Sequence, residues 1–203
     1  MTSRRIRPLV ALALVTAVLA GCTAESGGLL DGSPGEGDYT SSDGSTATFS
    51  QERRGEPVEF EAEGEDGASI SAERLRGKVV VLNFWYADCP PCRLEAPDLQ
   101  ALHESYVDDG DVIFLGVNVR DTAARARSFT EEFAITYPTI LDAADNAVQL
   151  AFAGKVAPNA VPTTLVLDRD GRVAARISGL VSDPGLLATL IDDALNETGI
   201  ALP

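Results

Sequence analysis

The chain contains few of the residues on which several common kinds of functional site depend. Its 203 residues include one histidine, one methionine, one tryptophan and three cysteines. A single histidine excludes most histidine-based zinc sites and most hydrolases that pair histidine with serine or cysteine. The 16 Lys and Arg residues are outnumbered by 31 Asp and Glu residues, so the net charge is -15. Because nucleic-acid binding depends on clustered positive charge, we expect no nucleic-acid partner.

The N-terminal apolar run, residues 9–19, is too short for a transmembrane helix, which takes about 20 apolar residues. Three arginines precede this run, and Ala20, Gly21 and Cys22 follow it. This order is typical of an export signal and resembles the bacterial lipobox. We therefore expect residues 1–21 to be a lipoprotein signal peptide. Cys22 would then carry a lipid that holds the protein on the outer face of the cell membrane.

The segment after the signal is rich in Gly, Ser, Asp and Glu and has little apolar side chain. Because no helical or strand period is visible there, we expect residues 22–56 to form a disordered acidic tether. Residues 57–203 have the pattern of a single α/β domain.

Within that domain, apolar periodicity predicts a mixed sheet with helices on both faces. The expected strands are 58–62, 68–71, 79–86, 111–119, 138–141, 163–168 and 172–178, the last two forming a hairpin. The expected helices are a single turn at 71–75, then 90–106, 122–134, 145–152 and a last helix capped by Asp183.

The residues most suggestive of chemistry are Cys89 and Cys92, which are separated by Pro90 and Pro91. They directly follow a buried strand and open a helix, where a cysteine pair can close and reopen a disulfide. Because the two prolines have no N–H, we expect milder stabilisation of the Cys89 thiolate than at other helix starts. Half of a zinc site is an alternative, but the chain offers only His103 and Cys22 as further ligands of these types. A purely structural disulfide is a second alternative, although a disulfide that closes so short a loop adds little stability.

Two stretches resemble the TlpA/ResA type of thioredoxin-fold thiol:disulfide oxidoreductase. Residues 83–99, NFWYADCPPCRLEAPDL, are similar to the signature of that group, and residues 161–168, VPTTLVLD, to its cis-proline strand. The likeness covers about residues 57–200. It implies a thioredoxin fold with that group's N-terminal strands and central insertion. It also implies that Val161, the cis-proline Pro162 and Trp85 contact the substrate.

Glu95 lies three residues after Cys92, on the apolar stripe of the expected helix. Burial there would raise its pKa, so that it could exchange a proton with Cys92. The alternative is an exposed acid that favours the helix start. Asn83 stands where thioredoxins have a buried aspartate, which strengthens the case for Glu95. Asp88, in place of the usual aromatic residue, would disfavour the Cys89 thiolate.

We therefore expect a membrane-tethered extracytoplasmic protein that reduces particular exported disulfides. The resemblance implies a role in cytochrome c maturation, with apocytochrome c as a candidate substrate and a membrane thiol carrier as electron donor. We expect a monomer with no metal and no cofactor. A disulfide-forming oxidase of the same fold is the alternative. From other classes, a metal-carrying chaperone lipoprotein fits poorly because His103 is too far along the helix, and no pattern of a thiol peroxidase is visible.

Overall fold

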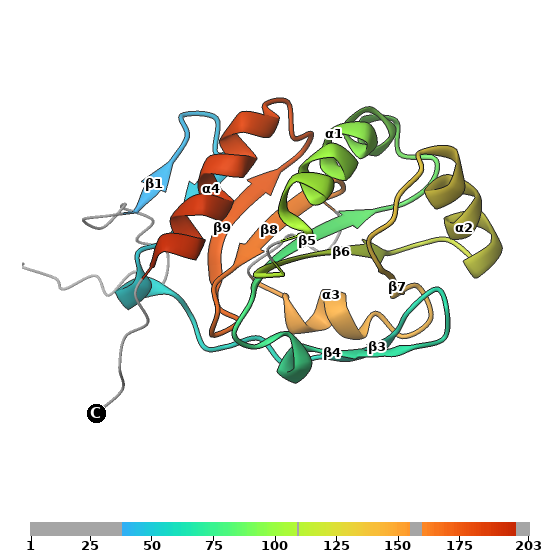
Figure 1. Cartoon of the computed structure of the whole chain (residues 1–203), viewed down its shortest axis with the longest axis horizontal. Helices are drawn as coiled ribbons and strands as arrows, with labels where there is room; N and C mark the ends of the chain where they lie inside the picture. Colours follow the sequence, from blue (N-terminus) through green and yellow to red (C-terminus); the bar gives the residue numbers. More distant parts are fainter. Residues whose placement is uncertain (1–37, 109, 155–159, 198–203) are drawn as a thin grey trace, which may run out of the picture. The chain divides into compact units, whose positions relative to one another are not determined.

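Strand β5 (Val79–Trp85) is the centre of the sheet and is buried along its whole length. The computed structural model describes residues 38–108, 110–154 and 160–197 (Figure 1). In the described part, β5 pairs in parallel with β6 (Val112–Asn118) and antiparallel with β8 (Thr163–Leu167). Its run of β-branched and aromatic residues suits a strand with both faces covered.

The main sheet has seven strands in the order β1-β2-β9-β8-β5-β6-β7. The remaining strands of this sheet are β1 (Tyr39–Thr40), β2 (Thr46–Thr48), β7 (Thr139–Leu141) and β9 (Val173–Ser178). A separate hairpin consists of β3 (Glu61–Glu63) and β4 (Ser69–Ser71). The helices are α1 (Pro90–Tyr106), α2 (Ala123–Glu132), α3 (Ala147–Ala151) and α4 (Pro184–Asn196), with short 3-10 turns at Gln51–Arg53 and Ala72–Leu75.

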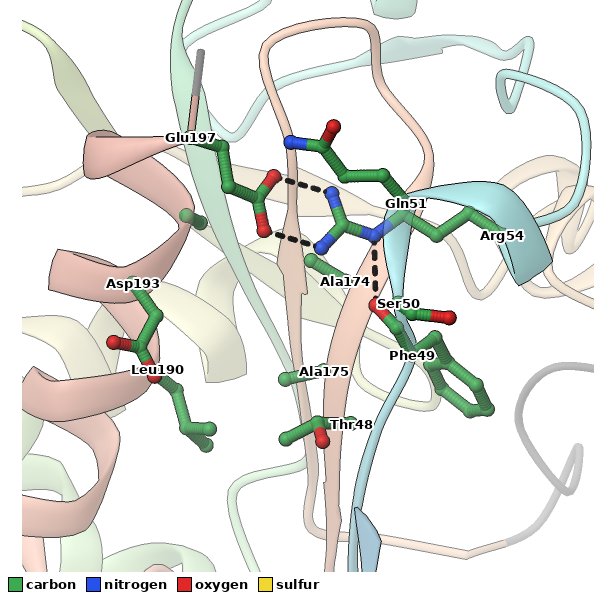
Figure 2. A pocket seen from close by; sticks show the side chains of 11 residues that line it. Thr48, Phe49, Ser50, Gln51, Arg54, Ala174, Ala175, Leu190, Asp193 and Glu197 are labelled. Carbon is green, nitrogen blue, oxygen red and sulfur yellow. Dashed lines mark hydrogen bonds and ion pairs between the residues drawn. The ribbon is translucent and has the colours of Figure 1, made fainter. Parts of the chain in front are cut away.

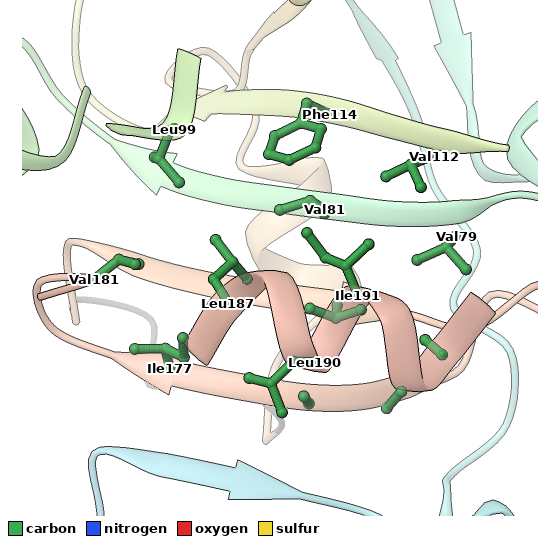
Figure 3. Close-up of a cluster of buried hydrophobic side chains, with 14 of the residues drawn as sticks. Val79, Val81, Leu99, Val112, Phe114, Ile177, Val181, Leu187, Leu190 and Ile191 are labelled. Atoms are coloured by element: carbon green, nitrogen blue, oxygen red, sulfur yellow. The ribbon is translucent and has the colours of Figure 1, made fainter. Parts of the chain in front are cut away.

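Helices α1 and α4 cover one face of the sheet, and α3 with the β3–β4 hairpin covers the other (Figure 1). On the first face, the α4 side chains Leu187 and Ile191 pack against Val79 and Val81 of β5 (Figure 3). On the second face, Phe152 beside α3 is fully buried against alternate residues of the same strand. These layers hold the carboxyl end of β5, where the cysteine pair begins, in a fixed position.

Most elements lie where the sequence predicts them. Helix α1 has the expected bounds, β8 and β9 form the expected hairpin, and the Asp183 carboxylate caps α4 by accepting from two backbone amides. The strand expected at 58–62 is shifted to β3, because Val58 and Phe60 are buried in the core instead of joining a regular ladder. Within the described residues, no helix combines the length and apolar character needed to cross a bilayer.

The prediction that the tether reaches residue 56 is wrong. Residues 38–56 include β1, β2 and a 3-10 turn, and β2 pairs antiparallel with β9. Ala47 of β2 is buried by this pairing. This strand is short and has no alternating apolar pattern that would predict it. It is held instead by backbone hydrogen bonds to β9. The predicted signal peptide, Cys22 and the first part of the tether lie outside the described residues.

Arg54, just after this segment, anchors it to the rest of the domain. Its guanidinium makes two hydrogen bonds of 2.5 Å to the Glu197 carboxylate after α4, and it donates to the Phe49 carbonyl (Figure 2). It also donates to Asp168 at 2.9 Å. The Arg54 side chain is 4% exposed, so this is a buried charge that three partners satisfy.

Candidate active site

Cys89 and Cys92 form a disulfide at the start of α1. Cys89 is the N-cap residue, and its sulfur accepts a hydrogen bond from the Cys92 amide over 3.2 Å. This amide is the donor expected from the two intervening prolines, which have no N–H to offer. Both cysteines are buried, at 1% and 2% exposure. The pair therefore lies at the positive end of a helix of 17 residues, which favours a thiolate when the disulfide is open.

The Glu95 side chain is buried one helical turn after Cys92, as the position on the apolar stripe predicts. It is 1% exposed, and both carboxylate oxygens are hydrogen-bonded. Asn83 donates to Oε1 over 2.8 Å, and the Val181 amide donates to Oε2 over 2.9 Å. Burial raises the pKa of Glu95 to about 7, against the opposite effect of these two hydrogen bonds. Glu95 can therefore change its charge near neutral pH.

Asn83 is a buried amide whose hydrogen bonds connect two elements. Besides Glu95, its Nδ2 donates to the Thr164 hydroxyl on β8 over 3.1 Å. The sequence analysis missed both Thr164 and Val181. Thr164 lies opposite Asn83 in the antiparallel register of β5 and β8, and this pairing is the signal that could have found it.

The peptide bond between Val161 and Pro162 is cis, as expected. Val161 is half-buried and packs against the cluster of side chains that contains both cysteines. The Pro162 carbonyl accepts a hydrogen bond of 2.8 Å from the Gly179 amide. Val161 is thus part of the cysteine site and Pro162 directly follows it, and the contact of both residues with a substrate stays a prediction.

Trp85 lies below the surface of the site. It is 3% exposed and stacks on Phe129 of α2, with ring centroids 4.1 Å apart. The indole packs in the same buried cluster as the two cysteines and presents almost no surface to a substrate. The substrate contact that the resemblance implies for Trp85 therefore has no support from its placement.

Asp88, directly before Cys89, is exposed and forms an ion pair with Arg125 of α2. Arg125 also lies 3.3 Å from the Asp121 carboxylate, and Asp121 accepts a hydrogen bond from the Ala87 amide. The negative charge expected to disfavour the thiolate is thus partly balanced by a cation. Asp121 and Arg125 have no signal in the sequence around the cysteines, because they lie just before α2 and within it, more than 30 positions further along.

His103 has no place at the cysteines, as expected. It is half-buried on α1, and its ring makes edge contacts with Phe114 and Tyr137, at 5.6 and 5.5 Å between centroids. Burial lowers its pKa. Among the described residues, no group of three or more His, Cys, Asp or Glu side chains is placed to hold a metal ion.

Sequence comparison relates the chain to named proteins of thiol–disulfide chemistry. A sequence profile described as the AhpC/TSA family matches residues 55–176. The thiol-disulfide oxidoreductase ResA of Halalkalibacterium halodurans is 32% identical over 116 residues, which are 57% of this chain and 62% of that protein. The thiol:disulfide interchange protein HelX of Rhodobacter capsulatus is 32% identical over 141 residues, 70% of this chain and 74% of HelX. The chain thus spans less than two thirds of that ResA protein's length.

Solved structures give the same relation. A DsbF homologue from Corynebacterium diphtheriae is 35% identical with a TM-score of 0.65, covering 78% of this chain and 99% of that one. A secreted thiol-disulfide isomerase from Corynebacterium glutamicum is 31% identical with a TM-score of 0.66, and the match covers 76% of this chain and 96% of that one. A thioredoxin family protein from Chlorobium tepidum is 26% identical with a TM-score of 0.64, and the match covers 71% of this chain and 98% of that one. The predicted thioredoxin fold is confirmed.

Proposed function

This chain belongs to the AhpC/TSA family, and we propose that it is a thiol–disulfide oxidoreductase that acts on exported proteins. The observation that carries the proposal is the Cys89–Cys92 disulfide at the start of α1, with the buried Glu95 carboxylate one helical turn further along. A disulfide that closes so short a loop contributes little to stability, whereas at a helix start it is well suited to exchange.

In the proposed reaction, the reduced Cys89 thiolate attacks a substrate disulfide. One substrate sulfur leaves as a thiolate and takes up a proton, while Cys89 and the other sulfur form a mixed disulfide. Cys92 then attacks Cys89, which forms the disulfide seen here and releases the second substrate thiol. Glu95 accepts the Cys92 proton in this step, since a base with a pKa near 7 is well matched to neutral pH.

We further propose that the protein works as a reductant outside the cytoplasm, held to the membrane by a lipid on Cys22. The names of ResA and HelX support thiol–disulfide exchange, and the N-terminal sequence pattern supports export. Apocytochrome c is the candidate substrate, and a membrane thiol carrier is the candidate electron donor.

Two measurements test this function. The equilibrium of the cysteine pair with glutathione gives its reduction potential, and a value well below that of the extracellular surroundings is expected for a reductant. A value well above it would instead indicate the disulfide-forming oxidase. The Cys92→Ser variant would hold substrates as mixed disulfides on Cys89, and a Cys89→Ser/Cys92→Ser variant serves as the control that captures none.

A further inference from the structure

A row of polar residues crosses the sheet beneath the cysteine pair. The strand register places Thr164 of β8 opposite Asn83 of β5, and Asn83 beside Gly116 of β6. Gly116 in turn lies beside Thr139 of β7. Residues in register on neighbouring strands have their side chains on the same face. Since Asn83 donates to Glu95 of α1, this face is the one that α1 covers.

The row is interrupted at Gly116, which has no side chain, and side-chain atoms of its neighbours approach the backbone there. A Cβ atom at this glycine would lie 2.8 Å from the Thr139 hydroxyl oxygen and 2.9 Å from the Trp85 indole nitrogen. Two polar atoms thus converge on the same point. A small pocket lies here, and its lining includes Cys92, Asn83, Trp85 and Thr139. Its volume is about 10 Å³, close to the lower limit for one water molecule.

The Thr139 hydroxyl has an unusual environment for a buried polar group. Thr139 is 4% exposed, and its Oγ1 has no hydrogen-bond partner among residues 38–108, 110–154 and 160–197. Leaving a buried hydroxyl without a partner costs about 1–3 kcal/mol. A valine of the same shape would avoid that cost. Because buried hydroxyls are normally hydrogen-bonded, we expect the Thr139 hydroxyl to have a partner in the pocket that it faces.

We propose that one water molecule occupies this pocket, is held by Thr139, and donates a hydrogen bond to Cys92 when the disulfide opens. This inference rests on the thiol–disulfide exchange proposed above. In the oxidised protein the Cys92 sulfur is bonded to Cys89 and is a weak acceptor. The Cys92 thiolate that forms when Glu95 takes its proton is a far better one. The water neither gains nor loses a proton in this role, and Thr139 is a positioning residue.

The Thr139→Val variant of the full chain tests the inference, with Thr139→Ser as its matched control. Valine keeps the shape and removes the hydroxyl, whereas serine keeps the hydroxyl. At a pH where reduced Cys92 is ionised, we expect valine to shift the equilibrium with glutathione about fivefold towards the disulfide, the ratio for one net hydrogen bond. It should also raise the Cys92 pKa, and serine should leave both quantities near their wild-type values.

Several results would overturn this inference. One is an unchanged equilibrium and an unchanged Cys92 pKa in the valine variant; another is an equal shift with serine, which would indicate packing. If valine prevents folding, Thr139→Ala gives the same comparison. High-resolution crystals of the wild-type protein should show a water bound to Thr139 Oγ1, and a dry pocket would contradict the proposal. If wild-type protein does not exchange with glutathione, the proposed function fails, while the crystals still decide the water.

Discussion

The Glu95 carboxylate on α1 accepts a hydrogen bond from the Val181 amide in the loop between β9 and α4. Two residues earlier in the same loop, the Gly179 amide donates to the carbonyl of Pro162. One short loop thus contacts both the buried acid and the cis-proline. This loop therefore links the charge of Glu95 to the position of the cis-proline.

Replacing Glu95 with Gln should slow release of substrate from the mixed disulfide by about 100-fold, the lower end for a positioned acid–base group. The amide cannot take the Cys92 proton, so the dependence of this rate on pH near 7 should flatten. Stopped-flow measurement of the release step from pH 5 to 9 would check both effects. Asp98→Asn, at an exposed position on the same helix, is the control. Equal rates in all three proteins would make Glu95 a structural residue.

The same residue predicts how stability depends on pH. Its pKa is raised from 4.5 to about 7 on folding, so between these values the folded chain holds a proton that the unfolded chain has released. The free energy of unfolding should therefore fall as pH rises from 4.5 to 7, by about 3 kcal/mol from this group. Urea unfolding at several pH values would measure the fall. In Glu95→Gln this contribution should be missing; an identical pH profile would contradict it.

Removing the Arg54 side chain should cost about 3 kcal/mol of stability, because the buried Asp168 carboxylate and the partly exposed Glu197 carboxylate would each lose a charged partner. The measurement is urea unfolding of Arg54→Ala at neutral pH. The neighbouring Arg53 offers a matched control, since its ion pair with Asp38 is half exposed and should be worth less than about 1 kcal/mol. Similar losses in the two variants would show that burial of the Arg54 pairs with Asp168 and Glu197 carries no extra stability.

The ion pair between Asp88 and Arg125 should adjust the Cys89 thiol. Asp88→Asn removes a negative charge and should lower the Cys89 pKa, and Arg125→Gln should raise it. Because both side chains are exposed, each change should stay below about one pKa unit. The Cys89 pKa of each variant is measured from the thiolate absorbance of the reduced protein as a function of pH. Shifts of the same sign in the two variants would rule out a simple charge effect.

Cys22→Ser should move the protein from the membrane fraction to the soluble fraction, if a lipid on Cys22 is the anchor. Cell fractionation with an antibody to the protein measures this. Cys89→Ser keeps Cys22 and should stay with the membrane, so it controls for the loss of a cysteine as such. Membrane attachment of both variants would exclude lipid on Cys22 as the anchor.

The parts of the fold that could be predicted are those with a local pattern. The apolar run of β5, the prolines that open α1 and the stripe position of Glu95 each depend on residues close together in the chain. Strand β2 could not be predicted, because a strand of three residues is too short to show an alternating apolar pattern. It is held by its pairing with β9.

The site was predictable to the same extent. Both cysteines and Glu95 stand out in the sequence, whereas the cis bond of Pro162 was implied only by the family resemblance. Thr164 and Thr139 were not, because their relation to Asn83 depends on the register of separate strands. Nothing in the local sequence of Thr139 marks it as a neighbour of the cysteine site, and the motif around Thr164 does not show which side chain it contacts.

The pairing of β2 with β9 also determines where mechanical load would enter the domain. A pull on the N-terminal end of the described chain acts on β1 and β2 at the edge of the sheet, and on the contacts of Arg54. Strands β9 and β8 stand between this edge and β5, which leads into the cysteine pair. Force along the chain would thus shear an edge strand before it could distort the redox site.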